Sequence, residues 1–197
     1  MAYRTVTALG ALFVAALALG AYGCTSMEGG RVHSAAEYRA RVDATQEAGV
    51  RTVLALSPAP DLGGHWPDEL AQEESSTSCV DDFGVDDGDV TRDQPLYSWD
   101  LDFADPAAYR AAVDHLRRAW QGQGLSVKDL PAPRQGEPGA GLPGISTTDE
   151  DGIDLSLRPD WYSGKPTVRA DGGCMRHEGA YDDVGADTPG SGTSGGS

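Results

Sequence analysis

The stretch YSWDLDF, residues 97–103, alternates strictly between apolar and polar side chains. Its apolar members are Tyr97, Trp99, Leu101 and Phe103. Because successive side chains of a strand point to opposite faces, this period of two predicts a strand with one buried and one solvated face. Such a strand needs a second layer to cover its apolar face, so this stretch requires a sheet packed against other elements.

An amphipathic helix is predicted directly after this strand. Asp105 is expected to cap it, with Pro106 in its first turn and Gly122 at its end. His115 lies beside the apolar face, and we expect it to be solvated at the flank of the helix. The apolar face itself follows the spacing of three and four residues and consists of Tyr109, Val113, Leu116 and Trp120.

A second helix is predicted over residues 34–56. Ser34 and Glu37 have the spacing of a capping box, Gly49 weakens the middle, and Pro58 lies just beyond its end. The acidic, Ser/Gly/Pro-rich stretch from there to Pro95 is expected to be mostly loop, with a short helix over 67–74.

Four further strands complete the predicted core. Asp151 and Gly152 form a favourable hairpin turn between two of them. The strands are expected at 125–130, 145–148, 153–159 and 165–170. Together these elements predict an α+β fold: an antiparallel-rich sheet of about four to five strands with helices on one face, plus an N-terminal signal helix.

The predicted organisation has one domain. Residues 34–174 form it, with 95–174 as the better-ordered core. Residues 24–33 are a polar tether, and residues 175–197 are rich in Gly, Ser and Asp, so we expect them to form a disordered tail.

The N-terminus has the pattern of a secretory signal peptide. Arg4 precedes an uncharged, largely apolar run over 5–21, and small residues follow it. An uncleaved transmembrane anchor is the alternative, and the run is close to the lower length limit for one.

The residues from Ala21 to Cys24, AYGC, resemble the lipobox of bacterial lipoproteins. The lipobox is degenerate, because the family usually has leucine where Ala21 stands. The resemblance implies that residues 1–23 are a lipoprotein signal peptide, that the Cys24 thiol receives a diacylglyceryl group, and that Cys24 becomes the first residue. A thiolate is the side-chain nucleophile suited to forming that thioether. The excess of arginine over lysine, with abundant Ala, Gly and Asp, also resembles actinobacterial proteins.

The chain has three cysteines, which leaves an odd one in an exported protein. If lipid occupies Cys24, then Cys79 and Cys174 remain as a pair for a disulfide in an oxidising compartment. Two unrelated reduced thiols are the alternative.

The negative net charge limits which partners the protein can bind. The formal net charge of −16 gives no basis for binding nucleic acid, and anionic headgroups would repel the chain. Membrane attachment must therefore be covalent or hydrophobic, which places the predicted protein at the extracytoplasmic face of the cell membrane through its lipid.

No residue pattern identifies a catalytic or metal site. The histidines, at positions 33, 65, 115 and 177, form no zinc-binding pair, there is no CxxC or G-x-S-x-G motif, and no cofactor is expected. The acidic run from Asp81 to Asp89 could supply oxygen ligands to Ca²⁺, but it lacks EF-hand spacing and is expected to be a solvated, metal-free loop.

Trp161 and Tyr162 lie in a predicted hairpin turn, where large aromatic side chains indicate a contact surface. The leading hypothesis is a non-enzymatic lipoprotein whose domain binds an envelope protein or a small ligand. A small cell-wall or membrane-proximal hydrolase is the rival, and a structural surface protein is a third class. A concave site with converging polar side chains would favour the hydrolase, and an apolar patch around Trp161 would favour interaction.

Overall fold

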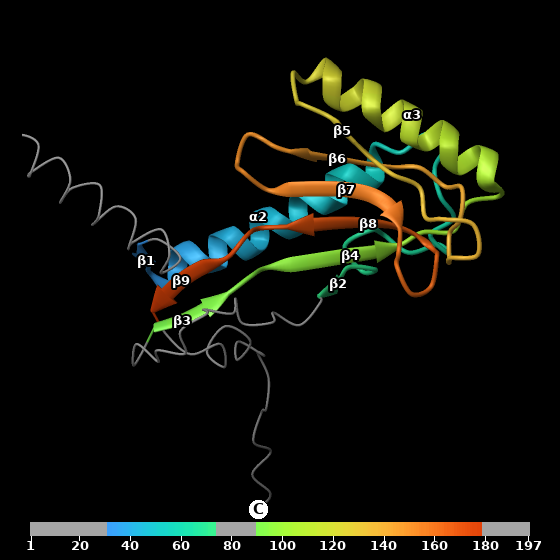
Figure 1. The fold of residues 1–197 in the computed structure, drawn as a ribbon. Helices are drawn as coiled ribbons and strands as arrows, with labels where there is room; N and C mark the ends of the chain where they lie inside the picture. The colour runs from blue at the N-terminus through green and yellow to red at the C-terminus, as the bar shows by residue number, and fades with distance from the viewer. Residues whose placement is uncertain (1–30, 74–89, 179–197) are drawn as a thin grey trace, which may run out of the picture.

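The structure, a computed structural model, describes residues 31–73 and 90–178 and has an α+β architecture (Figure 1). The helices are α2 (Ala35–Leu54) and α3 (Pro106–Gly122). The strands are β1 (Val32–His33), β2 (Gln72–Glu73), β3 (Val90–Asp93), β4 (Leu96–Asp100), β5 (Lys128–Leu130), β6 (Gly144–Thr148), β7 (Asp154–Pro159), β8 (Pro166–Asp171) and β9 (Met175–Glu178).

The main sheet has six strands in the order β2-β4-β8-β7-β6-β5, and every neighbouring pair is antiparallel. The predicted antiparallel-rich sheet is therefore confirmed, while the expected number of four to five strands is too low. Strand β2 was missed because its two residues are exposed and carry no apolar alternation. The predicted signal helix lies outside the described residues.

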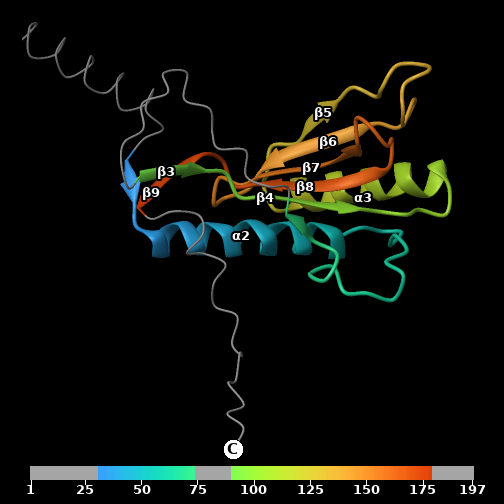
Figure 2. The same cartoon turned by 90° about the horizontal axis from the view of Figure 1, so that it is seen from below.

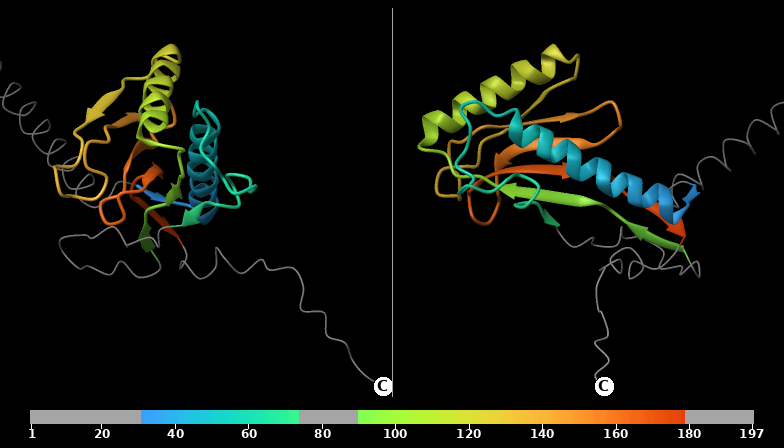
Figure 3. Two further views of the ribbon diagram at one scale, coloured as in Figure 1. Left: turned by 90° about the vertical axis from the view of Figure 1, so that its right-hand side faces the viewer. Right: turned by 180° about the vertical axis from the view of Figure 1, so that it is seen from behind.

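Both helices cover the same face of this sheet, as Figure 3 shows from the side. Helix α2 packs against β4 and β8, and α3 packs against β6. The core between the layers includes Trp99 and Leu101, from the predicted alternating stretch, and Leu157 and Val168 opposite each other on β7 and β8. The period of two correctly identified Trp99 and Leu101 as core residues. The expectation of a fully solvated opposite face is wrong, because Ser98 is also buried, and β4 ends at Asp100 rather than at Phe103.

The helix termini follow their predicted capping residues. The Ser34 side chain accepts a hydrogen bond from the Glu37 backbone N–H (3.2 Å), and the Glu37 carboxylate accepts one from the Ser34 N–H (2.9 Å). Asp105 accepts hydrogen bonds from the backbone of Ala107 and Ala108, at 2.8 Å each. Both predicted helices are confirmed to within two residues of their expected ends.

Gly49 brings α2 unusually close to the sheet. A Cβ atom at this position would lie 2.0 Å from Cη2 of Trp99, which is fully buried. The Trp99 indole cannot easily move away from α2, because its Nε1–H donates a 2.7 Å hydrogen bond to the carbonyl of Pro67. The glycine that weakens the helix in isolation is therefore what lets the helix pack on Trp99.

A second, three-stranded sheet has the order β1-β9-β3, with β1 parallel and β3 antiparallel to β9. Figure 1 shows it at the end of the domain where the described chain begins and ends. This sheet corrects two expectations: His33, expected in the tether 24–33, lies in β1, and Met175–Glu178, expected in the disordered tail 175–197, form β9. The folded domain extends to Glu178.

The polar strand β9 is ordered because its side chains have partners inside the domain. His177 is fully buried; its ring stacks on Tyr38 with a centroid distance of 3.9 Å, and its Nε2 lies 2.9 Å from Asp93 Oδ2. This strand has no apolar periodicity. The disorder predicted from composition is therefore wrong for Met175–Glu178.

The region before β4 also differs from its prediction. Strand β3 lies in the stretch expected to be loop, and its Asp93 is the buried partner of His177. The short helix expected over 67–74 is wrong: residues 67–70 form a turn, and the following residues enter β2.

Candidate functional site

Several predicted site residues lie outside the described residues. These are Cys24, Cys79 and the acidic run from Asp81 to Asp89. Cys174 is described, lies between β8 and β9, and is not free. Its pairing with Cys79 stays a prediction.

The histidines are scattered over the domain. His33 is on β1, His65 is in the loop after α2, and His177 is buried on β9. His115 is exposed on α3, as the helical pattern predicts. Within 31–73 and 90–178, no cluster of His, Cys, Asp or Glu has the arrangement to hold a metal ion.

Trp161 and Tyr162 lie together in the turn between β7 and β8, with 70% and 87% of their surfaces exposed. The predicted position of these residues in a hairpin turn is confirmed, while their role as a contact surface stays a prediction. Large aromatic side chains that are exposed next to each other are typical of contact surfaces. When a partner covers them, much apolar surface area is removed from water.

Asp160 fixes the shape of this turn. Its carboxylate accepts hydrogen bonds from the backbone N–H of Tyr162 (3.0 Å) and Ser163 (2.7 Å) and from the Ser163 hydroxyl (2.8 Å). Its own N–H donates to the carbonyl of Lys165 at 2.7 Å, which closes the turn across the two strands. The two aromatic residues are therefore carried by a braced backbone.

A glycine contact supports the turn from the side. Gly164 has a φ of +71°, and a Cβ atom there would lie 2.4 Å from the backbone N of Gly139. The loop before β6 thus rests directly on the turn, and any side chain at Gly164 would both strain the backbone and push this loop away.

The hydrogen bonds to Asp160 set its pH response. The backbone N–H of Ser163, followed by its hydroxyl and by neighbouring N–H groups, holds the pKa of Asp160 below its ordinary value. Because the folded-state pKa is lowered, the bracing is complete above the unfolded pKa, about 3.9, and is lost as pH falls through the folded value.

We therefore expect the Ser163 amide proton resonance to titrate with a midpoint below about 3.9 in an NMR experiment. Asp160→Asn should abolish that titration and leave the titrations of other carboxylates in place. A midpoint at or above the ordinary aspartate value would contradict the bracing role of this carboxylate.

The turn lies at the end of the domain opposite β1 and β9, as Figures 1 and 2 both show. The loop after α2 lies at the same end and carries Trp66, which is 69% exposed. An ion pair between Lys165 and Asp102 (4.0 Å) and a β-bridge between Asp102 and Asp61 connect the turn region to that loop.

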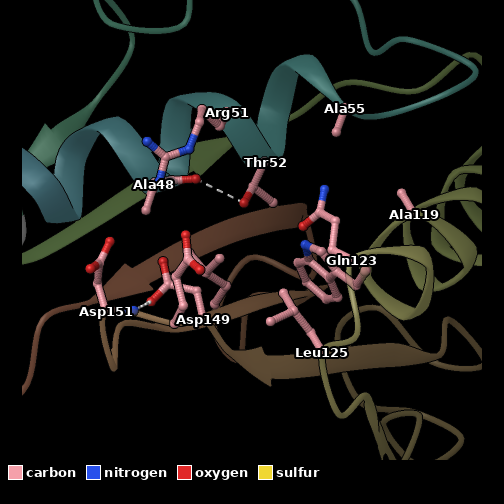
Figure 4. Close-up of a pocket in the computed structure, with 12 residues that line it drawn as sticks. Ala48, Arg51, Thr52, Ala55, Ala119, Gln123, Leu125, Asp149 and Asp151 are labelled. Carbon is pink, nitrogen blue, oxygen red and sulfur yellow. Dashed lines mark hydrogen bonds between the residues drawn. The ribbon is translucent and has the colours of Figure 1, made fainter.

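A cleft of about 380 Å³ lies between α2 and α3 above β7 (Figure 4). Trp120 and Leu125 contribute apolar lining, and Asp149, Glu150 and Asp151 line it from the β6–β7 turn. The sequence pattern missed this cleft, because its walls come from segments that periodicity cannot bring together.

The cleft is concave, as expected for a hydrolase, and two of its polar side chains, Thr52 and Asp149, are engaged in the fold. The Thr52 hydroxyl donates to the Ala48 carbonyl at 2.9 Å. The Asp149 carboxylate accepts hydrogen bonds from the N–H groups of Asp151 (3.0 Å) and Ile153 (2.9 Å). A hydroxyl nucleophile needs a base within hydrogen-bond reach, whereas the Thr52 hydroxyl donates to the Ala48 carbonyl.

No protein-family model, curated protein or solved structure matches this chain. Across the two described ranges, no helix combines the length and apolar character needed to cross a bilayer.

Proposed function

We propose that this chain is an extracytoplasmic lipoprotein, anchored to the cell membrane through Cys24, whose domain binds an envelope protein through the β7–β8 turn. One observation carries the binding function: Trp161 and Tyr162 are exposed side by side in sequence on a turn that Asp160 braces. Aromatic side chains lose little conformational entropy on binding, and a preformed backbone lowers that cost further.

The position of the turn supports an anchored binding protein. The described chain begins at Arg31, beside β1, whereas the turn lies at the opposite end of the domain. A lipid on Cys24 would hold the β1 end near the bilayer and leave Trp161 and Tyr162 directed away from it. A partner in the envelope could reach them without competing with the membrane surface.

Charge favours a particular kind of partner. The net charge of the chain is −16. A protein with an apolar patch surrounded by basic residues would be attracted over distance and then bury the two aromatic rings.

Photocrosslinking tests this function. We expect a photoreactive phenylalanine in place of Tyr162, in the full lipidated chain in cells, to give a discrete protein adduct. Trp161→Ala in the same chain should lower the adduct yield about tenfold, as truncating a central aromatic contact does. Because Trp161 is exposed, the melting temperature should not change.

The matched control places the same photoreactive residue at Arg39, which is exposed on α2 far along the chain from the turn. It should give no such adduct. Equal adducts from positions 39 and 162, or an adduct unaffected by Trp161→Ala, would show that the turn is not the binding surface.

A further inference from the structure

The cleft between α2 and α3 is a second concave feature, separate from the β7–β8 turn. Its volume of about 380 Å³ is in the lower part of the range for small-molecule sites, roughly 300–1,000 Å³. Trp120 is almost fully buried, and with Leu125 and Leu155 it gives the cleft an apolar lining. A ligand here would be small and would bury an apolar group.

The charged groups of the cleft are predominantly acidic. Asp149, Glu150 and Asp151 line one side, as Figure 4 shows for the two labelled aspartates. Among the described residues, the basic side chain that lines the cleft is Arg51, and its Nη1 lies 2.9 Å from Oε1 of Glu47, one turn earlier in α2. Arg41 also contacts this rim, through the carbonyls of Asp151 and Gly152, and the three carboxylates still outnumber these two arginines.

Two helix C-termini add to this negative potential. The lining includes Thr52 and Ala55 at the end of α2, and Ala119 and Gln123 at the end of α3. A helix C-terminus carries the negative end of the helix dipole and favours a cation. The last turn of α3 contains no basic residue, so it has no cation of its own.

The acidic turn is held in place before any ligand arrives. Arg41, from α2, donates to the carbonyls of Asp151 (2.6 Å) and Gly152 (2.9 Å), and its Nε donates to the carbonyl of Gly172 (2.8 Å). These bonds tie the β6–β7 turn to the helix beside the cleft. Because the rim is fixed, a ligand would not have to order it on binding.

From these features we infer that the cleft binds a small organic cation, an ammonium or guanidinium group carried on an apolar body. The apolar lining would take the body, and the carboxylates of Glu150 and Asp151, together with the C-terminus of α3, would take the positive group. A bare metal ion fits less well, since no metal-holding cluster occurs in the described part of the chain and the lining is half apolar.

Calorimetry with 2-phenylethylamine as the probe tests this inference on the full-length chain. We expect the amine to bind at least tenfold more tightly than 2-phenylethanol, which has the same body without the charge. Binding should weaken as salt is raised, because the attraction is electrostatic. The double variant Glu150→Gln, Asp151→Asn should weaken amine binding about tenfold, because it removes the two carboxylates that attract the positive group.

The control is Asp43→Asn, Asp114→Asn, which removes two exposed carboxylates from α2 and α3 without touching the lining. It changes net charge equally and should leave amine binding within about twofold. The inference is overturned if amine and alcohol bind equally, if the control weakens binding as much as the cleft variant, or if no amine binding is measured at millimolar concentration.

Discussion

Gly49→Ala is expected to lower the free energy of unfolding by about 3 kcal/mol, the upper end of the usual cost of overpacking a core. The added methyl group would lie 2.0 Å and 2.1 Å from two ring carbons of Trp99, far inside van der Waals contact. Trp99 is fully buried and is held by its hydrogen bond to Pro67, so the helix must move outward. Equilibrium denaturation in urea measures the loss.

The matched control is Gly122→Ala, the same exchange in the last turn of α3. A Cβ atom at Gly122 meets nothing within 4 Å. That variant should gain about 0.5–1 kcal/mol, because alanine is the better helix former. If both variants destabilise equally, or if Gly49→Ala is neutral, the close contact between α2 and Trp99 is not what the packing requires.

Cys24→Ser is expected to release the domain from membranes or to leave it as uncleaved precursor. Serine lacks the thiol that the lipid attachment uses, and two acyl chains are what make such anchoring stable. Fractionation of cells, followed by electrophoresis of the soluble and membrane pools, measures both outcomes.

Cys79→Ser is the control for that experiment, because it also removes one cysteine but leaves the lipobox intact. It should remain in the membrane fraction. If Cys24→Ser stays in the membrane fraction in a processed form, like the control, the anchor is not a lipid on Cys24.

The main sheet and its helices could be predicted because their residues bury one face in a regular pattern. Tyr97 to Phe103 and the α3 residues Tyr109 to Trp120 carry that pattern over enough positions to fix element type. Helix termini were predictable as well, since Ser34 and Asp105 cap through local hydrogen bonds.

The small sheet could not be predicted, because its stabilisation is long-range and polar. His177 is ordered by Asp93 and Tyr38, which are far from it in the chain, and neither His177 nor Asp93 belongs to an apolar repeat. A disordered tail was inferred from composition, yet composition does not reveal a strand whose polar groups find partners.

The two candidate sites differ in the same way. Trp161 and Tyr162 stood out in the sequence because aromatic residues in a hairpin turn are unusual, and the structure adds the bracing by Asp160. The cleft has no local sequence signal: the pattern predicts Trp120 as a core residue and Asp151 as a turn residue, and indicates nothing for Asp149. Only the fold brings them to one cavity.

The most direct test of the proposed lipoprotein is intact mass spectrometry of the mature protein purified from membranes. We expect the chain to begin at Cys24 and to carry the added mass of a diacylglyceryl group on that residue. A mature chain with a free, unmodified Cys24 thiol would contradict the lipid anchor on which the proposed function depends.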